Sequence, residues 1–196
     1  MKFFCSCSQD TYITDKIVGD TRQVNANVGQ AGTLDLFKLF SENTLRGEGG
    51  QHEISRILLK FDPSKLKKKF ISEVDTRSSN FSARLKMFDI STGNSTPSNF
   101  SLMVAPLSQS FIEGQGRDVG AFSHKDFSNF LTASYSAGVD SKWFASGANA
   151  GGTAGEAEKD WIEFIDFRDN QGLVKLDGTQ YFETGNEDLD IDVTKI

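Results

Sequence analysis

The sequence is poor in the residues from which many catalytic and metal sites are built. Its 196 residues include only 2 His, 2 Cys and 3 Pro. His52 and His124 are far apart in the chain, and neither has a second His or a Cys at metal-ligand spacing. This argues against a histidine-based zinc site and against a Cys/His nucleophile. P-loop, G-x-S-x-G and H-E-x-x-H motifs are also missing, so we expect a protein that is not an enzyme.

The two cysteines and the hydrophobic runs bear on the compartment. Cys5 and Cys7 are two positions apart, a spacing poorly suited to an unstrained disulfide, so we expect free thiols and folding in a reducing compartment. The first apolar run, at Phe3 and Phe4, is too short for a signal-peptide core, and no hydrophobic run approaches the length of a membrane span. We expect synthesis in a cytoplasm, no secretion by a signal peptide and no membrane insertion.

Positive charge is also in short supply. The formal net charge is −6, which argues against a nucleic-acid binder, since such a protein presents a basic surface. Apolar residues make up 37% of the chain and include 17 Phe, enough for the core of one domain over residues 1–196.

The clearest structural pattern lies at residues 54–62, which read ISRILLKFD. The period of two predicts a strand whose buried face carries Ile57, Leu59 and Phe61, while Arg56 and Lys60 point to water. The proline that follows cannot donate to a sheet ladder, so we expect the strand to end there.

Short alternating segments recur along the chain. They predict strands over residues 10–18, 33–40, 81–90, 100–105, 161–167, 180–183 and 189–193. A turn rich in Gly, Asn, Ser and Pro separates residues 81–90 from 100–105, so these two should form a hairpin. Helical spacing of apolar residues predicts one short helix at 124–134. We expect an all-β, jelly-roll-like antiparallel sandwich with long loops and at most one or two short helices.

Two tryptophans are candidates for ligand contact. Trp143 opens a segment rich in glycine and alanine, where its ring could stack on a sugar. Trp161 lies in an alternating segment, and we expect it in the core.

The acidic ladder of Asp188, Asp190 and Asp192 has two interpretations. It is either a solvent face that blocks edge-to-edge aggregation or part of a structural Ca²⁺ site. Side chains two apart on a strand lie about 7 Å apart, so one ion could not bind all three without ligands from a loop.

Several motifs occur together in an order found in a known family. They are DTYIT at 10–14, an Asn/Gly loop with Gly29, SRILLKFD at 55–62, PLSQSFIEGQG at 106–116 and IDVT at 191–194. This set resembles the DNRLRE-type β-sandwich domains, which are related to one class of carbohydrate-binding module, with Phe111 in place of the family's Trp. The combination also resembles structural proteins of tailed bacteriophages, especially marine ones.

The resemblance implies a jelly-roll domain without enzymatic activity. The family continues past its DVT segment with one more strand, so either the chain is a fragment or a partner supplies that strand. We expect a virion structural protein, made in the host cytoplasm, that decorates the capsid or forms part of a tail or fibre appendage. Its partners would be other virion proteins in a homo-oligomer or symmetric assembly. The residues expected to face a partner are Phe37, Leu39, Asp188, Asp190 and Asp192.

The alternative function is a glycan-binding module for receptor recognition, with Trp143 as its contact residue. No resident cofactor is expected apart from the structural Ca²⁺ considered above.

Overall fold

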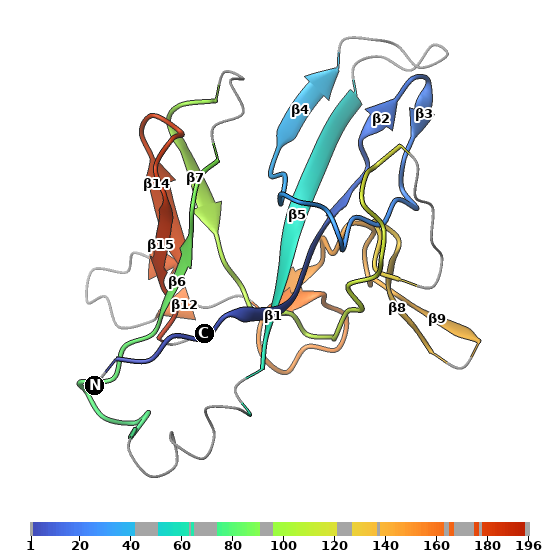
Figure 1. Cartoon of the computed structure of the whole chain (residues 1–196). Coiled ribbons are helices and arrows are strands. Elements are labelled where there is room, and N and C mark those ends of the chain that lie inside the picture. Colours follow the sequence, from blue (N-terminus) through green and yellow to red (C-terminus); the bar gives the residue numbers. More distant parts are fainter. Residues whose placement is uncertain are drawn as a thin grey trace. The chain divides into compact units, whose positions relative to one another are not determined.

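The computed structural model describes residues 2–41, 51–62, 64, 74–90, 96–120, 127–136, 138–162, 165–166, 175–176 and 178–194 (Figure 1). Every element in this part of the chain is a β-strand, which confirms the prediction of an all-β protein. The strands are β1 (Cys7–Thr14), β2 (Ile17–Val18), β3 (Thr21–Arg22), β4 (Lys38–Ser41), β5 (Gln51–Phe61), β6 (Arg84–Met87), β7 (Phe100–Met103), β8 (Thr132–Ser136), β9 (Val139–Lys142), β10 (Gly151–Gly152), β11 (Trp161–Ile162), β12 (Ile165–Asp166), β13 (Lys175–Leu176), β14 (Thr179–Phe182) and β15 (Leu189–Asp192).

The chain forms two compact units, and we describe each by itself. Unit 1 comprises Met1–Lys67, Ser108–Ala150 and Ala157–Asp160. Unit 2 comprises Lys68–Leu107, Gly151–Glu156 and Trp161–Ile196. The single domain over residues 1–196 and its jelly-roll arrangement stay predictions.

Unit 1 is built around β5. This strand runs antiparallel to β1 on one side and to β4 on the other (Figure 1). Tyr12 and Ile13 of β1 are both buried although they point to opposite faces, so both faces of this ladder are covered. The hairpins β2–β3 and β8–β9 complete the regular structure described for this unit.

The buried side of β5 differs from the predicted one. Leu58 is 3% exposed, whereas Phe61, predicted to be inward, is 41% exposed. Arg56 shares a face with Leu58, and its Nη1 donates a hydrogen bond of 2.8 Å to the carbonyl of Gly147. A loop therefore covers the face that was predicted to be solvent-exposed, because the arginine reaches a backbone acceptor there.

Asn27 joins three segments of unit 1 through a fully buried side-chain amide. Its Nδ2 donates to the carbonyls of Glu113 and Ser128, both at 2.8 Å. Its Oδ1 accepts from the N–H of Gly116 at 2.8 Å and of Gly29 at 3.4 Å. Donors and acceptors of this amide are thus all paired, as a buried polar group requires.

The backbone segments around Asn27 approach each other so closely that two positions have no room for a side chain. A Cβ at Gly116 would lie 1.7 Å from the carbonyl oxygen of Asn27, and one at Gly29 would lie 2.1 Å from that of Glu113. Gly114 between them has a φ of +88°, which favours glycine. The end of the motif at 106–116 is therefore packed against the loop that carries Asn27 and Gly29.

Unit 2 contains the antiparallel pairs β6–β15 and β7–β14. The predicted hairpin between residues 81–90 and 100–105 is therefore wrong, since each of these strands pairs with a strand from the end of the chain. Charge favours the observed partner of β6, because Arg84 and Lys86 both contact Asp190 of β15. In the other pair, the rings of Phe100 and Phe182 stack with centroids 5.0 Å apart.

The turn from β14 to β15 is held by one carboxylate. Glu187 accepts hydrogen bonds from the N–H groups of Glu183, Thr184 and Gly185 at 3.0, 2.8 and 2.7 Å. These bonds, first that from Thr184, stabilise the ionised form and lower the pKa of Glu187 to about 2.

Several predicted elements have different bounds or a different type. In the described residues of the strand predicted at 161–167, β11 and β12 are separate short strands. The described part of the predicted helix at 124–134 forms bends up to Leu131 and then β8, because Asn129 closes a turn that starts a strand; its first residues, 124–126, lie outside the described part. The strand predicted at 33–40 begins at Lys38. The strand predicted at 10–18 is split into β1 and β2. The strands predicted at 180–183 and 189–193 are confirmed as β14 and β15, with Ile191 buried.

Replacement of Asn27 by alanine tests the buried amide. Asn27→Ala removes both donors and the acceptor, leaving buried backbone groups of three segments unpaired, so we expect the free energy of unfolding to fall by about 3 kcal/mol. Urea denaturation of the full chain measures this. Asn25→Ala, at a half-buried side chain in the same loop, should change stability by less than about 0.5 kcal/mol. Equal effects of the two changes would contradict the role of Asn27.

Candidate functional site

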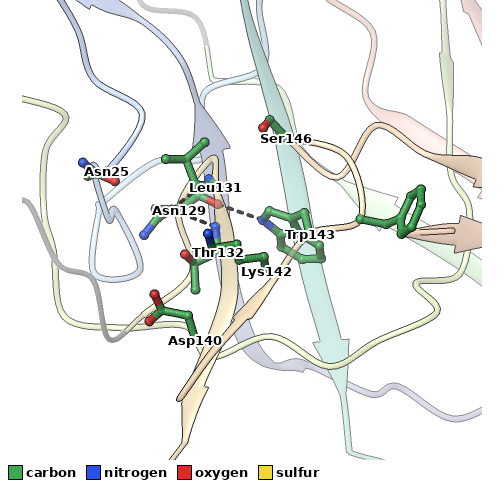
Figure 2. Close-up of a pocket in the computed structure, with 9 residues that line it drawn as sticks. Asn25, Asn129, Leu131, Thr132, Asp140, Lys142, Trp143 and Ser146 are labelled. Atoms are coloured by element: carbon green, nitrogen blue, oxygen red, sulfur yellow. Dashed lines mark hydrogen bonds between the residues drawn. The ribbon is translucent and has the colours of Figure 1, made fainter. Parts of the chain in front are cut away.

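Asn129 shapes the region of unit 1 where the β8–β9 hairpin begins. Its Oδ1 accepts from the N–H groups of Leu131 and Thr132 at 2.8 and 2.9 Å, which closes the turn before β8. Its backbone carbonyl accepts from Nε1 of Trp143 at 2.8 Å (Figure 2). The asparagine therefore connects the entry of β8 to the residue that follows β9.

The loop after Trp143 is anchored by a buried carboxylate. Asp160 is fully buried and accepts hydrogen bonds from the N–H groups of Phe144, Ala145 and Ala150, at 2.6, 3.0 and 3.0 Å. These three loop N–H groups therefore bind a carboxylate instead of a backbone carbonyl, an arrangement known as an anion-binding nest of amides.

Arg56 holds the same loop by donating hydrogen bonds to oxygen atoms of the loop. Besides the Gly147 carbonyl, it donates from Nη2 to Oδ1 of Asn149. Burial lowers the pKa of Arg56 from its ordinary value, while the carboxylates of Asp15 and Asp160 act in the opposite direction. The loop between residues 144 and 150 is thus held from two sides. The cation Arg56 of β5 binds its oxygen atoms, and the carboxylate of Asp160 binds its N–H groups.

Asn129, Trp143 and Phe144 also line a surface pocket with a volume of about 430 Å³. A pocket of this size matches those that hold small molecules or a sugar residue. The residues that line it are Asn25, Asn129, Leu131, Thr132, Asp140, Lys142, Trp143, Phe144 and Ser146 (Figure 2).

Several polar side chains of the pocket are not used by the fold. Asn25, Asp140, Lys142 and Ser146 make no side-chain hydrogen bond or ion pair within the described part of the chain. Asp140 and Lys142 are both exposed and alternate on β9, so their side chains share one face of the strand. The pocket therefore offers an acceptor, a cation and neutral hydrogen-bonding groups to a ligand.

Trp143 lines this pocket but does not form an exposed stacking surface. It is 4% exposed, and its indole N–H is bonded inside the protein. Trp161, expected in the core, is half-buried. Phe144 is the exposed aromatic side chain here, at 55%, and the sequence analysis missed it. The polar atom of its neighbour Trp143, Nε1, donates to the Asn129 carbonyl inside the protein.

The acidic ladder does not converge on one point. Asp190 bridges Arg84 and Lys86, with N–O distances of 2.5 and 2.6 Å. The bond from Lys86, followed by that from Arg84, lowers the pKa of Asp190. The carboxylates of Asp188 and Asp192 accept from backbone N–H groups, of Asp89 and Thr194 respectively. Asp190 is therefore occupied within unit 2.

Metal-ligand side chains are scattered over the part of the chain that the structure describes. No cluster of three or more His, Cys, Asp or Glu residues in that part could hold an ion. The proposed Ca²⁺ site stays a prediction. Cys5 and Cys7 are both free thiols, and burial raises the pKa of Cys7.

The other predicted contact residues lie on or beside β4. Phe37 is half-buried with the ammonium of Lys16 5.6 Å from its ring centroid, whereas Leu39 is 48% exposed. Phe40, which the sequence analysis did not single out, is 59% exposed and lies beside the ring of His52. The edge of this sheet thus presents two large apolar side chains to solvent.

Comparison with known proteins leaves the family open. The chain matches no protein-family model, no curated protein and no solved structure. Among the described residues, no helix is long and apolar enough to cross a membrane.

Replacing the indole of Trp143 distinguishes a structural role from a contact role. Trp143→Phe removes the buried hydrogen bond from the indole to the Asn129 carbonyl, so we expect a loss of about 1–2 kcal/mol in the free energy of unfolding. Phe144→Ala, at the exposed neighbour, should change it by less than about 0.5 kcal/mol. Thermal and urea unfolding measure both. A Trp143→Phe variant as stable as the unaltered chain would show that the indole is not part of the core.

Proposed function

We propose that this chain is a non-catalytic structural protein of a tailed-bacteriophage particle, either a capsid decoration or a component of a tail or fibre appendage. The motifs that resemble phage structural proteins support the proposal. In addition, large apolar side chains are exposed within the two units, and packing against other proteins would bury them. These residues are Phe4, Val18, Leu36, Leu39, Phe40, Phe61, Phe88, Ile90, Met103, Val139, Phe144 and Tyr181.

The edge strand β4 is the observation that carries the proposal. Proteins that stay monomeric protect sheet edges with charge, proline or a covering segment. β4 has one charged residue, Lys38, and exposes Leu39 and Phe40. A neighbour in a symmetric particle would bury these groups, and many weak contacts would add up to a stable assembly.

Self-association of the purified chain tests this function. We expect a discrete oligomer whose fraction rises with protein concentration, because apolar surface is buried on association. Native mass spectrometry and mass photometry measure the mass, and electron microscopy of concentrated protein shows whether rings or arrays form. The series is run with and without Ca²⁺, which also tests the predicted structural ion. A monomer at every concentration, with no ordered assembly, would contradict the proposal.

The pocket of unit 1 favours a second candidate, a glycan-binding module for receptor recognition. Sugar sites combine an aromatic surface with several hydrogen-bonding side chains. Here Phe144 is the exposed aromatic residue, and Asp140, Lys142 and Asn25 have polar groups available.

A glycan array separates the two functions. If the second is correct, the chain binds at least one surface polysaccharide, and Asp140→Ala or Lys142→Ala weakens that binding about tenfold, or ~1.4 kcal/mol. Both side chains are exposed, so the melting temperature should stay the same. Glu158→Ala, an exposed carboxylate of the same unit outside the lining, should leave binding unchanged. An array without any bound glycan would dismiss this candidate.

A further inference from the structure

The outer edge of β4 carries backbone groups that pair with nothing in the described part of the chain. Ser55 of β5 donates its N–H to the carbonyl of Phe37 at 2.9 Å, and the N–H of Phe37 returns to Oγ of Ser55 at 2.8 Å. The backbone groups of Phe37 therefore face β5. Since these groups alternate along a strand, those of Leu39 also face β5. Those of Lys38 and Phe40 face away from it, and no hydrogen bond within the described residues engages them.

A second copy of β4 can pair with this edge about a two-fold axis in only a few registers. Residues whose backbone faces outward must lie opposite each other, because antiparallel strands form hydrogen-bonded pairs in this way. A register with Lys38 opposite Lys38 places like charges together, which is unfavourable. A register with Phe40 opposite Phe40 forms only one hydrogen-bonded pair within β4, because Lys38 then lies opposite position 42, beyond Ser41, the last residue of β4.

The remaining register places Lys38 opposite Phe40 and Leu39 opposite Leu39. Each Lys38–Phe40 pair exchanges both of its N–H···O bonds. The ammonium of one copy lies beside the aromatic ring of the other, an attractive cation–π arrangement. The two Leu39 side chains meet in a non-hydrogen-bonded pair, where side chains are closest.

We propose that β4 is the contact strand of a symmetric dimer, in which β4 of one chain pairs antiparallel with β4 of a second copy and Leu39 lies on the two-fold axis. This inference rests on the proposed function, since it names one contact through which the chain assembles. A second copy of β4 is a suitable partner, because in this register Lys38 lies opposite Phe40 and the apolar Leu39 lies opposite itself. Leu39 and Phe40, now 48% and 59% exposed, are the side chains that it buries.

Disulfide trapping tests the predicted register. In a chain with Cys5→Ser and Cys7→Ser, Leu39→Cys places two thiols across the axis, where the Cα atoms of a non-hydrogen-bonded pair are about 4.5 Å apart. This separation lies within the range that a disulfide spans. We expect mild oxidation to give a cross-linked dimer on a non-reducing gel. Val139→Cys, at a 68% exposed position on the β8–β9 hairpin, is the matched control and should cross-link at least tenfold more slowly.

A proline substitution tests the backbone contact. Phe40→Pro removes an N–H that faces away from β5, so the ladder inside the chain is kept, as for prolines on edge strands. We expect it to raise the dimer dissociation constant at least tenfold in sedimentation velocity. Phe40→Ala, which loses the ring but keeps the N–H, should have a smaller effect. Circular dichroism and the melting temperature verify that each variant is folded.

The outcomes separate this inference from the proposed function. Cross-linking at Leu39→Cys no faster than at Val139→Cys, or cross-linking through Phe40→Cys but not Leu39→Cys, would overturn the β4 pairing. An oligomer that persists unchanged in Phe40→Pro would also overturn it, while leaving the assembly function to another surface. An unaltered chain that is monomeric at all concentrations and gives no cross-link would overturn both.

Discussion

The need to pair a buried amide with hydrogen-bond partners governs much of unit 1. Asn27 lies in the interior with donors and acceptor all used, and its partners come from segments more than 80 positions away in the chain. Leaving even one of these groups unpaired would cost about 1–3 kcal/mol. The neighbouring glycines follow from the same contact, because Gly116 must bring its backbone against Asn27 without a side chain between them.

Buried polar groups play the same part around the pocket. Asp160 binds the amides of the loop from 144 to 150, and Arg56 binds its carbonyl and amide oxygens. Together they fix a backbone that has few apolar side chains of its own. The indole of Trp143 is bonded to Asn129 in this interior. The groups left for a ligand are those that folding does not use, chiefly Asp140 and Lys142 on β9.

Two strands, β15 and β4, carry the residues expected to face partners, and they differ in whether their charged side chains are already paired within the protein. On β15, Asp190 is engaged by two cations of the neighbouring strand, so its charge stabilises the pairing within unit 2. On β4, the single Lys38 has no such neighbour, and the backbone beside it is unpaired along the outer edge within the described residues. The assembly contact that we propose therefore lies at β4, where pairing would bury apolar atoms and complete a ladder.

The sequence by itself determined the all-β class and the position of several strands. Period-two alternation indicates a half-buried strand, as for Ile191 on β15, and it located β5 although not its buried side. Tertiary structure decided what such a local period cannot encode. The pairing of β6 with β15, the covered face at Leu58 and the burial of Trp143 all depend on segments distant in the chain. The candidate pocket likewise could not be predicted, because Asn25 and Asp140 meet only when Asn27, Asn129 and Asp160 find their hydrogen-bond partners. Alternation shows that a strand has two faces, whereas long-range contacts determine which face is covered and by what.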